Sequence, residues 1–116
     1  MGGVTHIVQV SFKSDVSADV IQETCDRMLG LRESCLHPTT QKPYIRASKG
    51  GKDCSVEGMQ NGFTHVFVVE FDSVEDRDYY ALKDPKHLEF GAFIGTVVSQ
   101  VQVMDFMSNV FGLAVN

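Results

Sequence analysis

The stretch FTHVFVVEF, residues Phe63–Phe71, gives the strongest strand signal in the sequence. Aromatic and β-branched residues dominate it, and such side chains favour strands. Alternating side chains fall on opposite faces, with Phe63, His65, Phe67, Val69 and Phe71 on one face and Thr64, Val66, Val68 and Glu70 on the other. Both faces are apolar in the middle. We therefore expect both to be covered, one of them by something outside this subunit.

Two helices are predicted after this strand. Residues Ser73–Asp76 (SVED) form a capping box, in which the serine accepts from a helical amide and the acid three residues on reaches back. The first helix begins there and extends to Leu82. Asp84-Pro85 interrupts it, because the residue before a proline avoids helical geometry while proline itself suits the first helical position. We expect a second short helix over Pro85–Ile94.

The flanking segments complete the pattern. Residues Thr5–Lys13 (THIVQVSFK) alternate and predict the first strand, and Ser17 then supplies a capping oxygen for a helix. A short strand is expected over Tyr44–Ser48. The following KGGK sequence, Lys49–Lys52, predicts a turn. Residues Val97–Phe106 alternate again and predict the last strand.

The order of these elements predicts an α+β fold. It is the ferredoxin-like β-α-β-β-α-β subunit, a four-stranded antiparallel sheet with its helices on one face. The other face is left bare, and we expect Val8, Phe67 and Val103 to lie on it. Such an apolar patch predicts a sheet-to-sheet homodimer, a dimeric α+β barrel with an enclosed lumen. Residues 1–116 form a single domain, with its core at about 4–107 and an apolar tail at 108–116.

Composition excludes several classes of protein. The 116 residues suit one domain, and 43% hydrophobic with 22% charged residues predict a folded chain. A net charge of −5 disfavours nucleic acid and anionic membranes as partners. The sequence lacks an apolar run of the roughly 18 to 20 residues that a membrane span needs, and it starts without an export signal. We expect a cytoplasmic protein.

The sequence also predicts no bound cofactor or metal. Cys25, Cys35 and Cys54 are an odd number without a C-x-x-C pair, so we interpret them as free thiols. Cys35-Leu36-His37 offers two soft ligands, but no second pair at metal spacing accompanies it. Gly50-Gly51 is not followed by the Lys-Ser/Thr of a phosphate-binding loop.

Histidines are the main candidates for chemistry, since imidazole titrates at about 6.5 and can act as acid or base. His87, after a proline-started turn, is the candidate base; the alternative is a structural hydrogen bond from that turn to a strand. We expect His6 and His65 to meet across neighbouring strands. The alternative for both is a satisfied core histidine.

Two adjacent tyrosines are candidates for polarising a substrate carbonyl. Tyr79 and Tyr80 point about 100° apart on a helix, so only one can face the lumen. Packing is the alternative role for either. We expect Met28, Phe67 and Phe90 to line an apolar pocket, with core packing again the alternative.

Three blocks of the sequence resemble a known family. They are H-I-V-x-x-x-F-K at His6–Lys13, G-F-T-H-V-F-V-V-E-F-D-S-V-E-D-R-D-Y-Y at Gly62–Tyr80 and D-P-K-H-L-E-F at Asp84–Phe90. Together they resemble stress-responsive dimeric α/β barrel proteins, the Dabb family. The resemblance implies a homodimer of ferredoxin-like subunits.

The resemblance extends to the plant olivetolic acid cyclase of that family and its fungal relatives. That enzyme closes a linear polyketide by aldol condensation without cofactor or metal, and the resemblance places its catalytic histidine on His87. Its other pocket histidines match His6 and His65. Its catalytic tyrosine falls on Ala81, next to Tyr80, and a further pocket tyrosine falls near Met28.

These observations predict a cofactor-free enzyme of natural-product metabolism acting on an apolar, carbonyl-bearing small molecule. The reaction is an aldol-type cyclisation, a dehydration or a related lyase step. His87 acts as base or acid, and Tyr80 or His6 polarises the carbonyl. The alternatives are a non-catalytic stress-responsive protein that binds an apolar ligand and a cofactor-independent monooxygenase. Fold alone does not choose among them.

Overall fold

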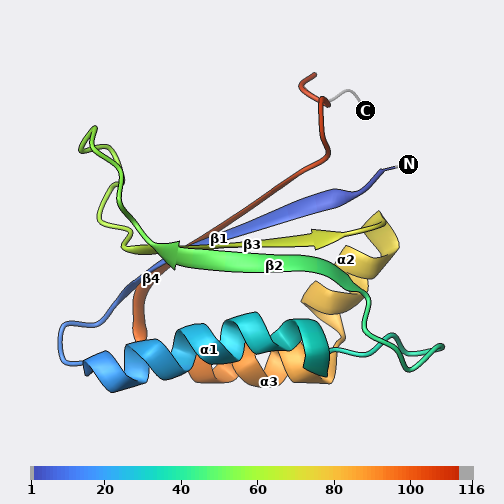
Figure 1. The fold of residues 1–116 in the computed structure, drawn as a ribbon, viewed down its shortest axis with the longest axis horizontal. Coiled ribbons are helices and arrows are strands. Elements are labelled where there is room, and N and C mark those ends of the chain that lie inside the picture. The colour runs from blue at the N-terminus through green and yellow to red at the C-terminus, as the bar shows by residue number, and fades with distance from the viewer. Residues whose placement is uncertain (1, 113–116) are drawn as a thin grey trace.

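The computed structural model describes residues 2–112 and confirms the predicted order of elements. Along the chain these are β1 (Val4–Phe12), α1 (Ala18–Ser34), β2 (Ile45–Lys52), β3 (His65–Phe71), α2 (Val74–Leu82), α3 (Pro85–Ile94) and β4 (Val98–Phe106) (Figure 1). The last residues of the predicted apolar tail, 113–116, lie outside the described residues.

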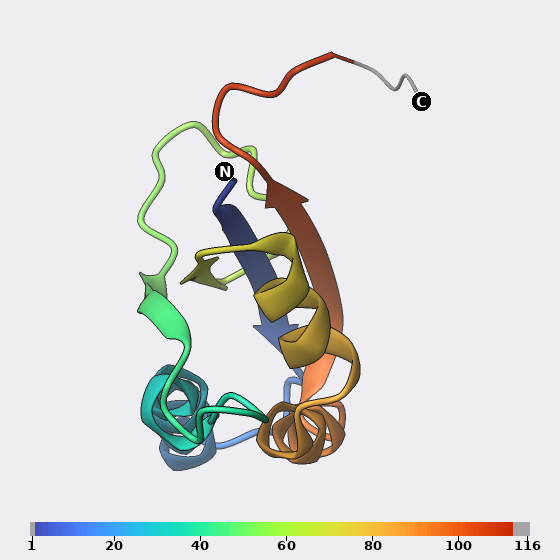
Figure 2. The ribbon, with the colours of Figure 1, turned by 90° about the vertical axis from the view of Figure 1, so that its right-hand side faces the viewer.

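The four strands form one antiparallel sheet in the order β2-β3-β1-β4. All three helices lie on the same side of it (Figure 1). Figure 2 shows α1 and α3 side by side, with α1 beneath β2 and α2 nearer the strand ends. The ferredoxin-like α+β prediction is thus confirmed.

Each helix begins where the sequence supplies a cap. The hydroxyl of Ser17 accepts from the Val20 amide at 3.2 Å, and that of Ser73 accepts from the Asp76 amide at 3.1 Å. Asp84 caps α3 directly before Pro85. Because these caps use local contacts, the sequence alone locates the start of each helix.

The core lies between the sheet and the helices. From the sheet it takes the side of β1 and β3 on which Val10 and Phe67 are almost fully buried. From the helices it takes Met28 of α1 and Phe90 of α3, each 4% exposed. Met28, Phe67 and Phe90, predicted as pocket-lining residues, therefore all belong to the apolar core.

The predicted turn at Lys49–Lys52 is wrong, because these residues continue β2. Gly50 lies opposite Phe67 of β3, and a Cβ atom built on Gly50 would be 2.4 Å from the Phe67 ring. Gly50 thus allows β2 and β3 to approach closely. Glycine serves both in such close contacts and in turns, and the sequence pattern does not distinguish the two roles.

The bare face of the sheet carries other residues than predicted. Val8 and Phe67 are buried under the helices, whereas Ile7 is paired with Val68 and Met104 on the opposite face. The predicted residues are correctly grouped by alternation, but alternation does not say which face the helices cover. Val103 shares the helix side with Val8 yet remains 53% exposed, because β4 is an edge strand.

Candidate functional site

Three predicted catalytic residues meet on the helix side of the sheet: His6 of β1, Tyr80 of α2 and His87 of α3. The ring centroids of Tyr80 and His87 are 4.0 Å apart, and those of His6 and Tyr80 are 5.7 Å apart, edge to face. Tyr80 is fully buried and His6 is 6% exposed. We call these three residues the His–Tyr cluster. It lies within one subunit, so the prediction that a lumen between two sheets holds these residues is wrong.

Two polar atoms of the cluster have no partner. Tyr80 Oη and His87 Nδ1 are both buried, and neither makes a hydrogen bond to any described residue. Buried polar groups in folded proteins are nearly always hydrogen-bonded, and leaving one unpaired costs about 1–3 kcal/mol. The Tyr80 hydroxyl can donate to a polar ligand, and the His87 ring nitrogen can accept from one.

The protonation states of this pair suit acid–base chemistry. Burial, assisted by the nearby His6, lowers the pKa of His87, so its imidazole is neutral at pH 7. Burial raises the pKa of Tyr80, with smaller contributions from Cys35 and Asp84, so its hydroxyl keeps its proton. A neutral base therefore lies beside a protonated donor.

His6 is held by two residues that the sequence analysis missed. Its Nδ1 donates to Asp105 Oδ1 at 2.7 Å, and Asp105 Oδ2 accepts from Arg77 Nη1, also at 2.7 Å. Because a carboxylate accepts at Nδ1, the neutral His6 ring carries its proton there and has Nε2 as an acceptor. One signal could have revealed Asp105, since it is the only acidic residue in the predicted strand Val97–Phe106.

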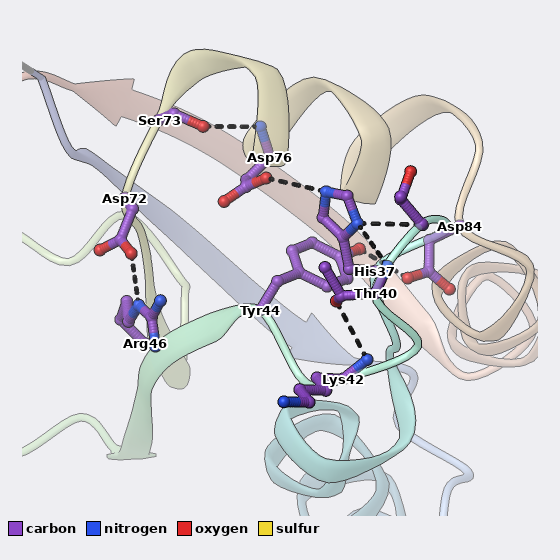
Figure 3. Close-up of polar contacts among 10 residues, drawn as sticks. His37, Thr40, Lys42, Tyr44, Arg46, Asp72, Ser73, Asp76 and Asp84 are labelled. Atoms are coloured by element: carbon purple, nitrogen blue, oxygen red, sulfur yellow. Dashed lines mark hydrogen bonds and ion pairs between the residues drawn. The ribbon is translucent and has the colours of Figure 1, made fainter.

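His87 is positioned by a buried carboxylate at the start of its helix. Asp84 is 1% exposed; its Oδ1 accepts from the Lys86 amide at 2.9 Å and its Oδ2 accepts from the Tyr44 hydroxyl at 2.5 Å. Figure 3 shows Tyr44 reaching from the start of β2 toward Asp84. Burial and the same carboxylate raise the pKa of the Cys35 thiol to about 12. The Tyr44–Asp84 hydrogen bond joins the start of α3 to the residue directly before β2.

His37 contributes a separate contact that organises the loop before β2. Its Nδ1 accepts from the Thr39 amide at 3.0 Å, while its Nε2 lies 3.9 Å from Asp76 Oδ1 (Figure 3). The ring packs edge-on against Tyr44, with centroids 6.1 Å apart. His37 thus ties this loop to α2 and to the residue that binds Asp84.

Two other predicted site residues lie outside the cluster. The expectation that His6 and His65 meet is wrong, because His6 is opposite Val69 whereas His65 is opposite Val10, four residues further along β1. His65 instead packs edge-on against the Phe12 ring. Tyr79 packs against Tyr44, with ring centroids 5.8 Å apart. Of the two tyrosines, Tyr80 is therefore the one that faces the cluster.

Other features concern membranes, metals and thiols. Within residues 2–112 no helix combines the length and the hydropathy needed to cross a bilayer. The same residues contain no group of three or more His, Cys, Asp or Glu side chains arranged to hold a metal ion. All three cysteines are free, as predicted.

Comparison with known proteins identifies relatives along almost the whole chain. The family model described as "Stress responsive A/B Barrel Domain" (Dabb) matches residues 4–108. A stress-response A/B barrel domain-containing protein of Arabidopsis thaliana, HS1, is 31% identical over 105 residues, covering 90% of this chain and 89% of HS1.

Solved structures give the same result. A hydroxynitrile lyase from Passiflora edulis is 26% identical with a TM-score of 0.81, covering 95% of this chain and 97% of its own. A protein from Thermobifida fusca, described as dimeric, ferredoxin-like and of unknown function, is 17% identical with a TM-score of 0.70 and 91% coverage of both chains. The latter likeness concerns the fold alone.

Proposed function

Because this chain belongs to the stress-responsive A/B barrel (Dabb) family, we propose that it is a cofactor-free lyase in which the His–Tyr cluster performs acid–base chemistry. The substrate is an uncharged small molecule that carries a carbonyl or hydroxyl group and an apolar substituent. The closer resemblance to a polyketide cyclase stays a prediction. Similarity to the hydroxynitrile lyase supports a lyase step, since that name denotes cleavage of a carbon–carbon bond beside a hydroxyl group.

One observation carries the proposal: Tyr80 Oη and His87 Nδ1 are both buried without a hydrogen-bond partner among the described residues, on two rings whose centroids lie 4.0 Å apart. A structural role would give each atom a protein hydrogen bond. A catalytic role leaves them available for the substrate, and active sites often hold such strained or unsatisfied groups. His87 as a residue is partly exposed, although its Nδ1 is buried.

The chemistry needs one proton to move. In cleavage, His87 Nδ1 accepts the substrate hydroxyl proton, the O–H electron pair forms the carbonyl, and the bond to the adjacent carbon breaks. The leaving carbon keeps that bonding pair and takes the proton from the His87 imidazolium. Tyr80 donates a hydrogen bond to the developing carbonyl oxygen. The same steps in reverse give an aldol reaction. In a molecule that carries both an acidic C–H and a carbonyl group, that reaction is an aldol-type cyclisation.

A substitution of His87 tests this role. We expect His87→Ala to reduce cleavage of mandelonitrile, or of the aldol adduct of benzaldehyde and acetone, by about 10²- to 10⁴-fold. Benzaldehyde release is followed by ultraviolet absorbance. The control is His65→Gln, which changes a histidine that packs against Phe12 outside the cluster and should keep wild-type rates.

The outcomes separate the candidate functions. Wild-type rates in His87→Ala would exclude the assigned base. Binding of these compounds without turnover in the wild type would favour the non-catalytic ligand-binding alternative, and oxygen uptake with an aromatic polyketide would favour the monooxygenase.

We also propose a homodimer formed through the bare face of the sheet. The uncovered face carries Ile7, Val68 and Met104, and Met104 is 63% exposed. Relatives of the same fold are described as dimeric, which supports the proposal. Light scattering should give twice the 12.8 kDa chain mass. A Met104→Glu variant should shift the protein toward monomers, and a wild-type monomer at micromolar concentration would contradict the proposal.

A further inference from the structure

The His–Tyr cluster is assembled from the sheet and from two helices that meet at one short joint. His6 belongs to β1, whereas Tyr80 lies in the last turn of α2 and His87 in the first turn of α3. Only Lys83 and Asp84 separate these two helices. The three rings therefore come together only if the joint is held at a fixed place over the sheet.

Asp84 holds this joint by three hydrogen bonds. Its amide donates to the Tyr79 carbonyl of α2 at 2.8 Å, and its Oδ1 accepts from the Lys86 amide of α3 at 2.9 Å. These two bonds are local, and they end one helix and begin the next. The third bond, from the Tyr44 hydroxyl to Asp84 Oδ2 at 2.5 Å, comes from a residue 40 positions away (Figure 3). Of the three, only the Tyr44 bond ties the joint to a distant part of the chain.

Tyr44 is fixed by the core around it. It is 4% exposed and directly precedes β2, so its backbone is anchored at the edge of the sheet. Its ring packs against those of Phe71 and His37, with centroids 6.2 Å and 6.1 Å away. Burial, with a smaller contribution from Asp84, raises the pKa of Tyr44, so the hydroxyl keeps its proton and donates a hydrogen bond to the carboxylate.

We propose that Tyr44 is a positioning residue for the His–Tyr cluster, which acts through Asp84 to fix the α2–α3 joint over the sheet and thereby the spacing of the Tyr80 and His87 rings. Neither Tyr44 nor Asp84 contacts the substrate in this account. The inference rests on the proposed function for the reaction that the spacing serves. The spacing itself is measured without turnover.

Two pairs of variants test the inference. Tyr44→Phe keeps the ring and removes the donor to Asp84. Its matched control is Tyr79→Phe, because the Tyr79 ring packs against Tyr44 and the substitution leaves both that ring and the Tyr44–Asp84 bond in place. In the second pair, Asp84→Asn and Asp84→Ser both retain a good helix cap. Only the asparagine offers a second polar atom to the Tyr44 hydroxyl.

The second pair also separates position from charge. Burial lowers the pKa of His87 and His6 lowers it further, while the Asp84 carboxylate opposes them. Both Asp84 substitutions remove this charge, so both should lower the titration midpoint of His87 in NMR spectra to the same extent. A difference between them in ring spacing or turnover therefore reports the contact with Tyr44.

Ring spacing is measured by the nuclear Overhauser effect between the Tyr80 and His87 ring protons, at a temperature where every variant is folded. Tyr44→Phe and Asp84→Ser should weaken this signal, and Tyr79→Phe and Asp84→Asn should retain it. With mandelonitrile as substrate, Tyr44→Phe should reduce kcat and kcat/KM together by about 10- to 10²-fold. Asp84→Ser should be slower than Asp84→Asn, and Tyr79→Phe should keep the wild-type rate.

The outcomes decide between positioning and stability alone. A wild-type signal and wild-type turnover in a less stable Tyr44→Phe would overturn the inference, and so would equal behaviour of the two Asp84 variants. A weakened signal with wild-type turnover would also overturn it, because the spacing would then not serve the reaction. If the wild type turns over no compound but the signal changes as expected, the spacing role is supported and only the lyase proposal fails.

Discussion

Replacing Tyr80 with phenylalanine should stabilise the unliganded protein while reducing its activity. The Tyr80 side chain is fully buried, and its hydroxyl makes no hydrogen bond among the described residues. Phenylalanine keeps the ring, which packs against His87 and Phe71, and removes only the unpaired oxygen. The substitution therefore removes a desolvation cost without breaking an internal contact.

The size of the effect follows from the cost of an unpaired buried group, about 1–3 kcal/mol. For 116 residues the entropy of unfolding is about 0.24 kcal/mol/K, so each 1 kcal/mol raises the melting temperature by about 4 °C. We expect Tyr80→Phe to gain at least about 1 kcal/mol and to melt about 4 °C higher. Its turnover should fall by about 10²-fold or more, because the carbonyl loses its donor.

Tyr44→Phe is the matched control. The Tyr44 side chain is also buried, but its hydroxyl donates to Asp84 at 2.5 Å. Its removal takes a donor from a buried carboxylate, so Tyr44→Phe should lose about 1–3 kcal/mol. Urea denaturation of both variants and the wild type gives the free energies of unfolding.

Opposite signs for the two tyrosines would support the reasoning. A loss of more than about 0.5 kcal/mol in Tyr80→Phe would refute it, since that result requires a satisfied hydroxyl in the native protein. If Tyr80→Phe is more stable but turns over at the wild-type rate, we would conclude that the Tyr80 hydroxyl is unpaired in the native protein and takes no part in catalysis.

Further predictions concern pH, strand packing and the carboxylate beneath the cluster. Because burial holds the pKa of His87 below its ordinary value of about 6.5, the folded protein binds this proton less readily than the unfolded chain does. The free energy of unfolding in urea should therefore decrease as pH falls below about 6.5, less steeply in His87→Ala, and equal slopes would contradict the assignment. Gly50→Ala should cost about 1–3 kcal/mol because its Cβ would strike the β3 phenyl ring, whereas Gly51→Ala meets nothing within 4 Å and should change stability by less than about 0.5 kcal/mol. Equal melting temperatures for the two glycine variants would be inconsistent with the β2–β3 register. Asp105→Asn should lose about 1–3 kcal/mol and most turnover, since the new amide cannot accept from both the histidine and the guanidinium that the carboxylate binds; wild-type stability and rate would show that the contact is dispensable.

Local patterns predicted the elements well. Alternation at Phe63–Phe71 and Thr5–Lys13 identified two central strands, since successive residues of a strand point to opposite faces. The capping serine of Ser73–Asp76 and the Asp84-Pro85 pair located the starts of α2 and α3. These signals depend on neighbours in the chain, so no tertiary information is needed to interpret them.

Predictions that required register or orientation succeeded less well. Alternation placed His6 and His65 each on the correct face of its strand. It does not give the register between two strands, so it could not show which residues are opposite each other. Tyr79 and Tyr80 had equal claims until the rotation of α2 against the sheet chose Tyr80. Gly50 was interpreted as a turn because glycine suits both turns and close strand contacts.

The sequence by itself therefore determined the order of the strands and helices, most of their positions, and the two residue types, histidine and tyrosine, available for acid–base chemistry. Only the tertiary structure decided that His6, Tyr80 and His87 meet within one subunit, and that Asp105, 99 positions from His6 in the chain, holds the histidine in place. Periodicity and capping arise from neighbouring residues. Contacts between distant segments depend on strand register and helix packing, which many weak interactions across the whole core set together.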